Sequence, residues 1–225
     1  MQVTERRRWR LKGPEMEGLV ARWYAGIRNS GSQAQENRRQ AARLTAGLPA
    51  GARVLEVAPG PGYLAIEMAR TGRVQVTGLD ISRSFVEIAS ENAAKAGVSV
   101  DLRQGDAAGM PFESESFDLI VCQAAFKNFT QPRSALAEMH RVLRTGGAAV
   151  IQDMSHDASH TDIEREVGKM ELGRLSSFTT KATLEMLRRR AYSPAQFESL
   201  VAESPFQTCA IETEGIGLEV RLEKS

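Results

Sequence analysis

Residues 56–62 (EVAPGPG) form a glycine-rich segment between a short apolar run and a helix-like run, YLAIEMA. A strand that leads through such a turn into a helix is a common ligand site. Gly60 and Gly62 permit close backbone approach, and the following helix N-terminus favours a negative group. With Ala65 the segment also satisfies the loose dinucleotide pattern G-x-G-x-x-A. The segment is therefore compatible with a dinucleotide, a phosphate, another nucleoside cofactor, or a tight turn without a ligand.

Side chains within and after this segment separate those possibilities. Glu56 would repel a pyrophosphate, and Pro59 and Pro61 lack the N–H groups that a phosphate needs. Asp80 follows a second apolar run and suits the two hydroxyls of a ribose, while Asp106 follows a third and suits an exocyclic amine. No P-loop lysine accompanies these acids. The pattern favours a nucleoside ligand without phosphates.

The elements that must position these residues alternate between strand and helix patterns. Strands are predicted over residues 54–57, 74–80, 98–106, 117–126 and 148–154, with helices between them. Two closing strands, near 207–215 and 218–223, are close enough in sequence that they must pair antiparallel. Ser82 and Gly97 bound one helix, and Gly146 and Gly147 end another that begins at Pro132. We therefore predict an α/β fold with helices on both faces of a mostly parallel sheet.

Helical patterns also flank this alternating region. An amphipathic helix is predicted from Met16, a second over residues 35–48, and a break between them at 30–33. Residues 155–190 read as polar helices interrupted at Gly168 and Gly173, and Ser193 with Gln196 predicts a capping box for a last helix. We predict an N-terminal helical cap, residues 1–49, and a core, residues 50–225, with a helical insertion at about 155–192.

Five motifs in consecutive order carry a resemblance to a known family. The runs VLEVAPGPGYLAIEMA, LDIS, GDAAGMPFESESFDLIVCQAAF and EMHRVLRTGGAAVIQDM, over about residues 50–154, resemble the class I S-adenosylmethionine-dependent methyltransferases. The resemblance implies a Rossmann-like doubly wound sheet of seven strands, one of them antiparallel. It also implies S-adenosylmethionine as the cofactor and methyl transfer to a small organic acceptor.

The resemblance assigns cofactor contacts position by position. Glu56, Ala58, Gly60 and Gly62 would line the methionine and ribose side, Asp80 would bind the ribose, and Ile81, Asp106 and Ala107 would meet the adenine. Cys122 and Gln123 would lie beneath the methionine portion, and Tyr24 would reach the donor carboxylate. Ala58 replaces the commonest first loop glycine and Thr145 a frequent proline, and Lys127 and Asn128 stand where histidines are frequent.

The catalytic demands on such a protein are small, because a sulfonium donor is already activated and the protein mainly aligns the reactants and excludes water. A general base matters only when the acceptor must lose a proton. We name Asp153 and His156 as candidate bases and Lys127 as a group that orients the acceptor; ordinary loop or surface roles are the alternatives. The helical insertion is expected to cover the acceptor as a lid.

Composition limits the partners of the protein. Twenty-nine basic and 28 acidic residues leave a formal charge of +1, which gives no bulk attraction to nucleic acid or membranes. No apolar run is long enough to span a bilayer, and no secretory signal is recognisable, so we expect a cytoplasmic protein. Cys122 and Cys209 are expected to be reduced and buried, and no metal site is predicted.

Alternative functions remain open from sequence alone. A nicotinamide-dependent oxidoreductase is disfavoured by the loop, and a cofactor-binding module without turnover is kept open by Lys127 and Asn128. The basic runs RRRWRLK and LRRRA could bind phosphate, which would indicate an RNA methyltransferase. The balanced overall charge argues against this function. The sequence also leaves a homodimer open.

Overall fold

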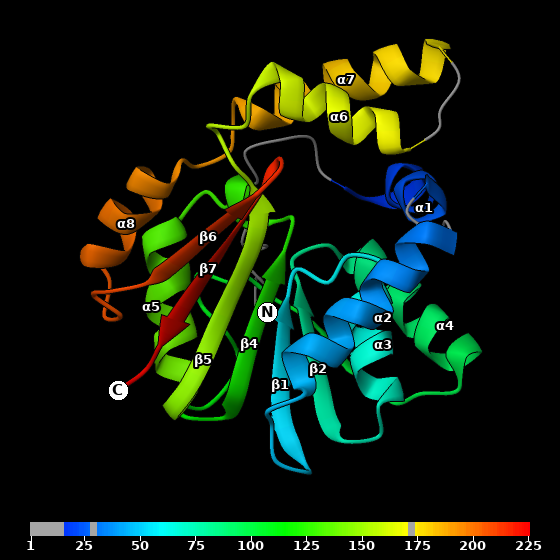
Figure 1. Cartoon of the computed structure of the whole chain (residues 1–225). Helices are drawn as coiled ribbons and strands as arrows, with labels where there is room; N and C mark the ends of the chain where they lie inside the picture. Colours follow the sequence, from blue (N-terminus) through cyan, green and yellow to red (C-terminus); the bar gives the residue numbers. More distant parts are fainter. Residues whose placement is uncertain (1–15, 28–30, 171–173) are drawn as a thin grey trace, which may run out of the picture.

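The computed structural model describes residues 16–27, 31–170 and 174–225, which contain one seven-stranded sheet (Figure 1). The strand order is β3-β2-β1-β4-β5-β7-β6, and only β7 runs antiparallel to its neighbours within the described chain. The strands are β1 (Ala52–Val57), β2 (Val74–Asp80), β3 (Asp101–Gln104), β4 (Phe117–Gln123), β5 (Leu143–Met154), β6 (Ala210–Glu214) and β7 (Gly217–Glu223). The predicted Rossmann-like α/β fold is confirmed.

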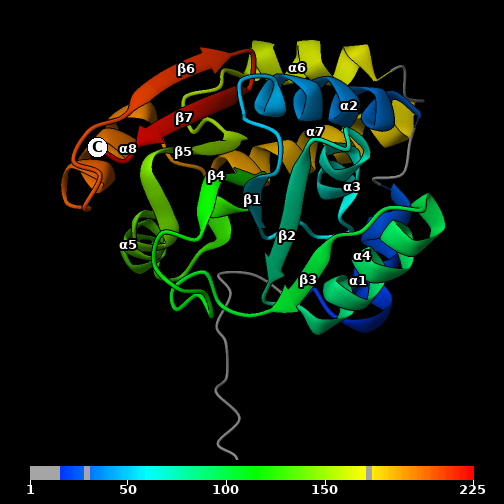
Figure 2. The same cartoon turned by 90° about the horizontal axis from the view of Figure 1, so that it is seen from below.

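Helices cover both faces of this sheet, as the view from below shows (Figure 2). They are α1 (Gly18–Ile27), α2 (Gly31–Thr45), α3 (Tyr63–Arg70), α4 (Arg83–Ala96), the short 3₁₀ helix η1 (Phe126–Asn128), α5 (Pro132–Val142), α6 (His160–Lys169), α7 (Arg174–Arg188) and α8 (Pro194–Ala202). Alternate strand residues face opposite layers. Val54 and Val121 pack with α2 and α3, while Leu55 and Ile120 pack with α5 and α8.

Strand boundaries differ from the prediction at several places. The fourth strand ends at Gln123, because Phe126 lies in η1, and β6 is shorter than the predicted 207–215. Only Asp101–Gln104 pairs with β2, so the third strand is shorter than residues 98–106. The helix after Pro132 ends at Val142, and Gly146 and Gly147 lie inside β5. The reason is an irregular register: Phe117 of β4 pairs with Leu143, but Leu119 pairs with Ala148. The two glycines therefore accommodate a bulge in β5 rather than a helix end.

Helix ends follow the predicted capping chemistry in several cases. The Ser82 hydroxyl accepts from the Phe85 N–H, and Gly97 ends α4 with a left-handed φ of 69°. Ser193 and Gln196 form the capping box that starts α8. The predicted break at residues 30–33 is wrong from Gly31 onward, where α2 begins; residue 30 lies outside the described residues. Gly168 lies within α6, and Gly173 is outside the described residues.

Helices α6 and α7 form a lid above the carboxyl ends of the strands (Figure 1). They share a small apolar cluster in which Ile163 and Val167 meet Met154 at the end of β5. The lid leaves and rejoins the core at one place, since Ser155 and Tyr192 form an isolated bridge and the His156 N–H donates to the Tyr192 carbonyl at 3.0 Å. The insertion is therefore anchored at both ends to the same strand edge.

The N-terminal helices pack on different parts of the core. Ala21 and Ala25 of α1 are buried against Phe85 and Ile88 of α4. Ala41 of α2 lies in the same apolar cluster as the central strands. The division into a cap (1–49) and a core (50–225) stays a prediction.

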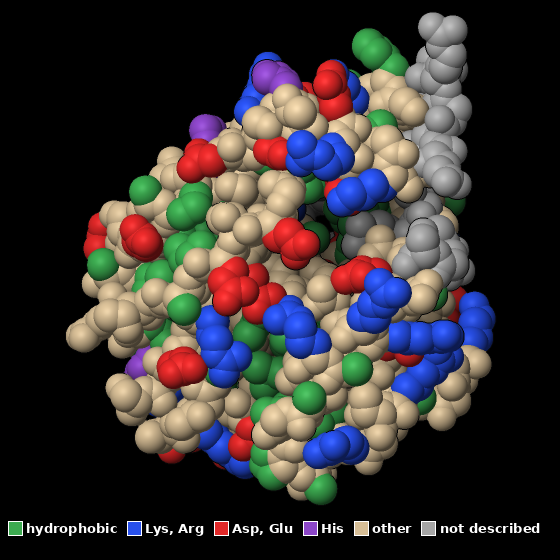
Figure 3. All heavy atoms as spheres, in the orientation of Figure 1, with side chains coloured by type: hydrophobic (Ala, Val, Ile, Leu, Met, Phe, Trp, Pro, Cys, Tyr) green, Lys and Arg blue, Asp and Glu red, His purple; other side chains and the backbone are tan. Residues whose placement is uncertain are grey.

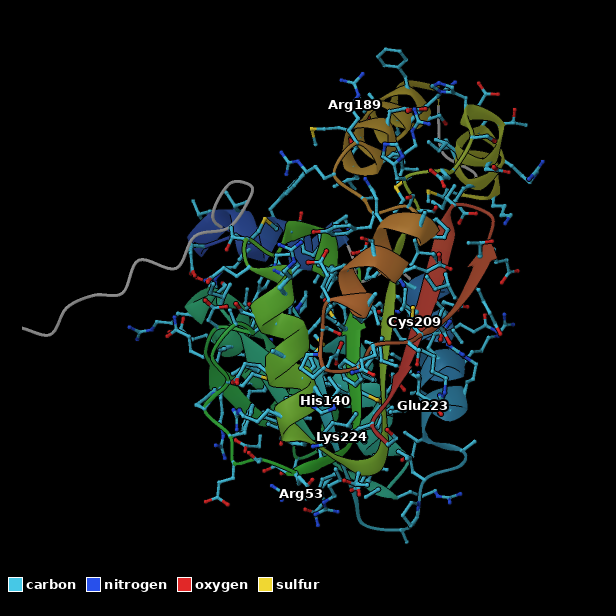
Figure 4. The ribbon with its side chains drawn as sticks, turned by 90° about the vertical axis from the view of Figure 1, so that its left-hand side faces the viewer. Arg53, His140, Arg189, Cys209, Glu223 and Lys224 are labelled. Atoms are coloured by element: carbon cyan, nitrogen blue, oxygen red, sulfur yellow. The ribbon has the colours of Figure 1, made fainter. Side chains whose placement is uncertain are left out.

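The two cysteines are free and differ in burial. Cys122 is fully buried in β4, whereas Cys209, labelled in Figure 4, is only partly buried, so full burial was wrong for the second thiol. Among the described residues, no helix is both long and apolar enough to cross a membrane.

The start of α3 gives a test of close packing between helices. A Cβ added at Gly62 would lie 2.9 Å from the Ala89 Cβ of α4, and its φ is +80°. Gly72 has a φ of +65° but no neighbour within 4 Å, so Gly72→Ala measures backbone strain alone, about 1 kcal/mol. We expect Gly62→Ala to lower the free energy of unfolding in urea by about 1–3 kcal/mol more. Equal losses in the two variants would contradict a packing role for Gly62.

Candidate functional site

A cavity of about 480 Å³ opens at the carboxyl ends of β1, β2 and β4, a size typical of small-molecule sites. The molecular surface is hollowed between the lid and the top of the sheet (Figure 3). Residues at the strand ends and in the loops after them form one part of its wall, and helices that include α1, α2, α3 and α7 contribute to the rest. The lining includes Tyr24, Asn37, Glu56, Ala58, Gly60, Tyr63, Asp80, Ile81, Asp106, Ala107, Gln123, Asn128, Phe129, Met186, Leu187 and Arg190.

The segment after β1 turns sharply enough to expose its backbone to this cavity. Ala58, Gly60 and Gly62 have φ values of 57°, 55° and 80°. Ala58 thus adopts the left-handed conformation that glycine adopts without strain, at a cost of about 1 kcal/mol. Its N–H donates to the Leu79 carbonyl at 2.8 Å. A Cβ at Gly60 would meet nothing within 4 Å, so open space for a ligand lies beside this residue.

Glu56 is a buried carboxyl without full hydrogen bonding. Its Oε2 has no hydrogen-bond partner among the described residues, and its side chain lines the cavity. Burial raises the pKa of Glu56 to about 8; the backbone N–H of Ala65 opposes this rise, and the charge of Asp80 adds to it. The site therefore holds an unsatisfied acid that a cationic ligand group would complete.

Asp80 ties the loop to the second strand. Its Oδ2 accepts from the Gly60 N–H and its Oδ1 from the Ser82 N–H, both at 2.9 Å. Burial raises the pKa of Asp80 to about 6, and these N–H groups oppose the shift. Each carboxylate oxygen retains a further acceptor site, so Asp80 can still accept ribose hydroxyls.

Five more of the predicted cofactor residues line this cavity. Ile81, Asp106 and Ala107 line the same cavity, and so does Tyr24, whose ring meets Phe85 edge-on at 5.9 Å. Gln123 also lines the cavity.

Cys122 is fully buried and is not among the described lining residues. Burial is the main cause that raises the pKa of the Cys122 thiol well above its usual value, so Cys122 is a neutral core residue.

Sequence patterns assigned no cavity role to Asn37, Tyr63 or the α7 residues Met186 and Leu187, and Arg190, just after α7, entered only as part of the basic run LRRRA. Asn37 is 3 % exposed and belongs to the cavity lining. An asparagine within a polar helical run gives no sequence signal of such burial. These residues reach the cavity only through the packing of α2, α3 and α7.

The three candidate catalytic residues lie outside the described cavity lining. Lys127 and Asp153 form a buried ion pair with Nζ and Oδ1 2.6 Å apart. The Lys127 Nζ also donates to the Ala124 carbonyl, and the Lys127 N–H donates to Asp153. The pair thus holds η1 against β5. His156 is about half exposed beside Asp157, and its predicted role as a base stays untested.

Comparisons with known proteins agree with this geometry. A family described as Methyltransferase domain matches residues 55–151. The demethylmenaquinone methyltransferase of Deinococcus radiodurans is 37% identical over 108 residues, which are 48% of this chain and 45% of the relative. Residues 55–151 are a methyltransferase domain.

Two solved structures extend this likeness. One from Methanococcus maripaludis, described as an S-adenosyl-L-methionine-dependent methyltransferase, has a TM-score of 0.72 at 20% identity and covers 96% of this chain and 97% of its own, which shows the fold. The cyclase SpnF is 29% identical with a TM-score of 0.53, over 57% of this chain and 47% of its own. The chain spans about half the length of the curated relatives it matches. A nicotinamide-dependent oxidoreductase is not favoured.

The cavity of this methyltransferase domain fits S-adenosylmethionine on its own chemistry. The unpartnered Glu56 oxygen suits the ammonium group of the methionine portion, and Asp80 suits the ribose. Gly60 leaves room for the ligand. The predicted cofactor residues other than Cys122 and Gly62 are among the described lining residues.

Glu56 predicts a pH dependence for the ligand-free protein. Its unfolded pKa is 4.5 and its folded pKa about 8, so the unfolded chain loses the proton first and stability falls as pH rises through this window. The pKa of Asp80 is also raised, but only to about 6. Between pH 6 and 8 the pH dependence of stability therefore comes mainly from Glu56. We expect unfolding free energy in urea to fall there by about 1 kcal/mol per pH unit.

The matched variants are Glu56→Gln and Glu113→Gln, the second on an exposed loop. Glu56→Gln should flatten the profile between pH 6 and 8, and Glu113→Gln should leave it unchanged. A wild-type slope that survives in Glu56→Gln would show that another group causes it.

We expect the single and double variants of the Lys127–Asp153 pair to differ in their free energy of unfolding. Lys127→Met leaves a buried carboxylate without its counter-ion and should cost about 3–5 kcal/mol of stability. Lys127→Met with Asp153→Asn removes both charges but keeps an acceptor for the Lys127 N–H, so it should recover at least half of that loss. The control Arg83→Met breaks an exposed pair with Glu87 and should cost about 0.5 kcal/mol or less. Urea unfolding measures all three; a double variant less stable than the single would contradict this account.

Proposed function

We propose that the protein transfers the methyl group of S-adenosylmethionine to a small organic acceptor. One observation carries the proposal: a single cavity joins the acids suited to the donor with a mostly apolar wall suited to a second molecule. Phe129, Met186 and Leu187 belong to that wall. Methyl transfer needs donor and acceptor held in line in such a shared space.

In this proposal each donor-facing residue has a defined task. Glu56 binds the donor ammonium, Asp80 accepts from the ribose hydroxyls, and Asp106 accepts from the adenine amine. Ile81 and Ala107 pack on the adenine, and the Tyr24 hydroxyl and the Gln123 amide bind the methionine end. Bound S-adenosylmethionine supplies an already activated methyl group, so the protein contributes alignment and exclusion of water.

Lys127 and Asp153 are better explained as positioning residues than as a base. Their side chains are occupied with each other, and the pair fixes the backbone around Ala124, which lines the cavity. We retain His156 as a candidate base that only an acceptor with a proton to lose would need.

Part of the acceptor wall lies outside the family match. Residues 55–151 contain the loops for the donor and Phe129, whereas Asn37, Met186 and Leu187 lie before or after them. The Deinococcus relative is named for demethylmenaquinone, so quinols belong in the acceptor panel. A cytoplasmic location, no nucleic-acid partner and a homodimer stay predictions.

The test begins with calorimetric titration of S-adenosylmethionine, S-adenosylhomocysteine and NADH. We expect saturable binding of the first two, and at least about tenfold weaker binding in Asp80→Ala because a buried carboxylate that accepts two hydroxyls is lost. Asp101→Ala, on the exposed end of β3, is the matched control. Preferential binding of NADH would overturn the proposal.

A second arm tests turnover with a radiolabelled methyl donor and a panel of phenols, quinols, amines and thiols. Label transfer that depends on Asp80 supports the enzyme. Tight donor binding without transfer to any member would instead support a cofactor-binding protein of other chemistry, as the likeness to a cyclase allows.

A further inference from the structure

Arg190 is the sole basic side chain among the described residues that line the cavity. It follows α7, at the edge of the lid, and lies one turn from Met186 and Leu187, which line the same wall. Its own N–H continues the helical turn by donating to the Leu187 carbonyl at 3.0 Å. Arg190 therefore joins the cavity lining from the lid and not from the loops after β1, β2 and β3.

Two cations near Arg190 on the lid are paired, whereas Arg189, exposed like Arg190, makes no ion pair among the described residues. Arg188 pairs with Glu185 at 3.0 Å and donates to the Ala158 carbonyl, and Lys181 pairs with Glu164. Arg190 has no ion pair or side-chain hydrogen bond within the described residues. An arginine that faces a cavity without a partner presents a planar set of donors that matches a carboxylate or a phosphate.

The charged residues of the cavity lining come from two parts of the chain. Glu56, Asp80 and Asp106 supply acids after the strands, where the donor is proposed to bind, and they repel an anion. Arg190 supplies the compensating positive charge from the lid. The buried Asn37 adds a neutral amide to the cavity lining.

We propose that Arg190 makes this a methyltransferase for anionic acceptors: the acceptor carries a carboxylate or a phosphate that Arg190 binds, and its apolar body packs on Met186 and Leu187. The inference rests on the proposed function and names the acceptor class of the same site. Arg190 is a specificity residue in this account, because it binds the acceptor and leaves the reacting atoms to the rest of the cavity.

The experiment uses the full chain saturated with S-adenosylhomocysteine and three probes of one shape: 4-hydroxybenzoate, its methyl ester and 4-hydroxyphenyl phosphate. Calorimetric titration at fixed ionic strength compares wild type, Arg190→Gln and Arg190→Lys. The matched control is Arg189→Gln, because Arg189 is exposed, absent from the described cavity lining and labelled on the lid in Figure 4. The anionic probe that binds more tightly shows whether Arg190 prefers a carboxylate or a phosphate.

We expect wild type to bind an acid probe at least about tenfold more tightly than the ester, because the ester cannot accept a charge-assisted pair of hydrogen bonds from Arg190. Arg190→Gln should abolish that preference, Arg190→Lys should retain part of it, and Arg189→Gln should retain all of it. Binding of S-adenosylhomocysteine itself should change by less than about twofold in every variant.

Three results would overturn the inference. One is equal binding of acid and ester by wild type, or no binding of either acid. Another is a preference that survives in Arg190→Gln. The third is loss of S-adenosylhomocysteine binding in Arg190→Gln alone, which would assign Arg190 to the carboxylate of the donor. Failure of wild type to bind S-adenosylhomocysteine would refute the proposed function instead, and titration of the acid probes into the ligand-free protein would still report on Arg190.

Discussion

The hydrogen bond from the Gly60 N–H to the Asp80 carboxylate fixes the loop after β1 against the end of β2. Strands β1 and β2 pair in parallel register, which brings Val57 opposite Leu79 and places both strand exits at one edge. The positive φ values of Ala58 and Gly60 then turn the loop backbone toward Asp80. Two buried carboxyls, Glu56 and Asp80, are the result. Burial disfavours the charged form of each carboxyl, and under the proposed function a ligand with matching groups compensates for that cost.

Sequence patterns predicted the donor half of the molecule because its determinants are local. The apolar run of β2, the cap at Ser82 and the glycines of the loop each act over a few residues, and the structure confirms them. The bulge at Gly146 was missed because it depends on register with β4, which no single segment encodes. The cavity roles of Asn37 and Arg190 were missed for the same reason: helices far apart in sequence bring them to one cavity.

The apolar cluster of the lid is separate from the two clusters on the faces of the sheet. The clusters on the faces of the sheet stabilise the strand exits that hold the donor loops. Ile163, Val167 and their neighbours form a separate small cluster within the lid, joined to the sheet through Met154. A change in the lid surface therefore alters the acceptor wall while the register of β1 and β2 is preserved. The buried Lys127–Asp153 pair holds η1 to the end of β5.

The lid begins and ends at adjacent positions, where Ser155 meets Tyr192. A segment whose two ends already touch imposes no distance on the rest of the chain, so its length and content are free to vary while the closing hairpin of β6 and β7 stays in place. Evolution can therefore vary the part of the cavity wall that the lid contributes within one contiguous stretch of sequence, while β1 and β2 keep their register and the lid keeps its contacts with Met154.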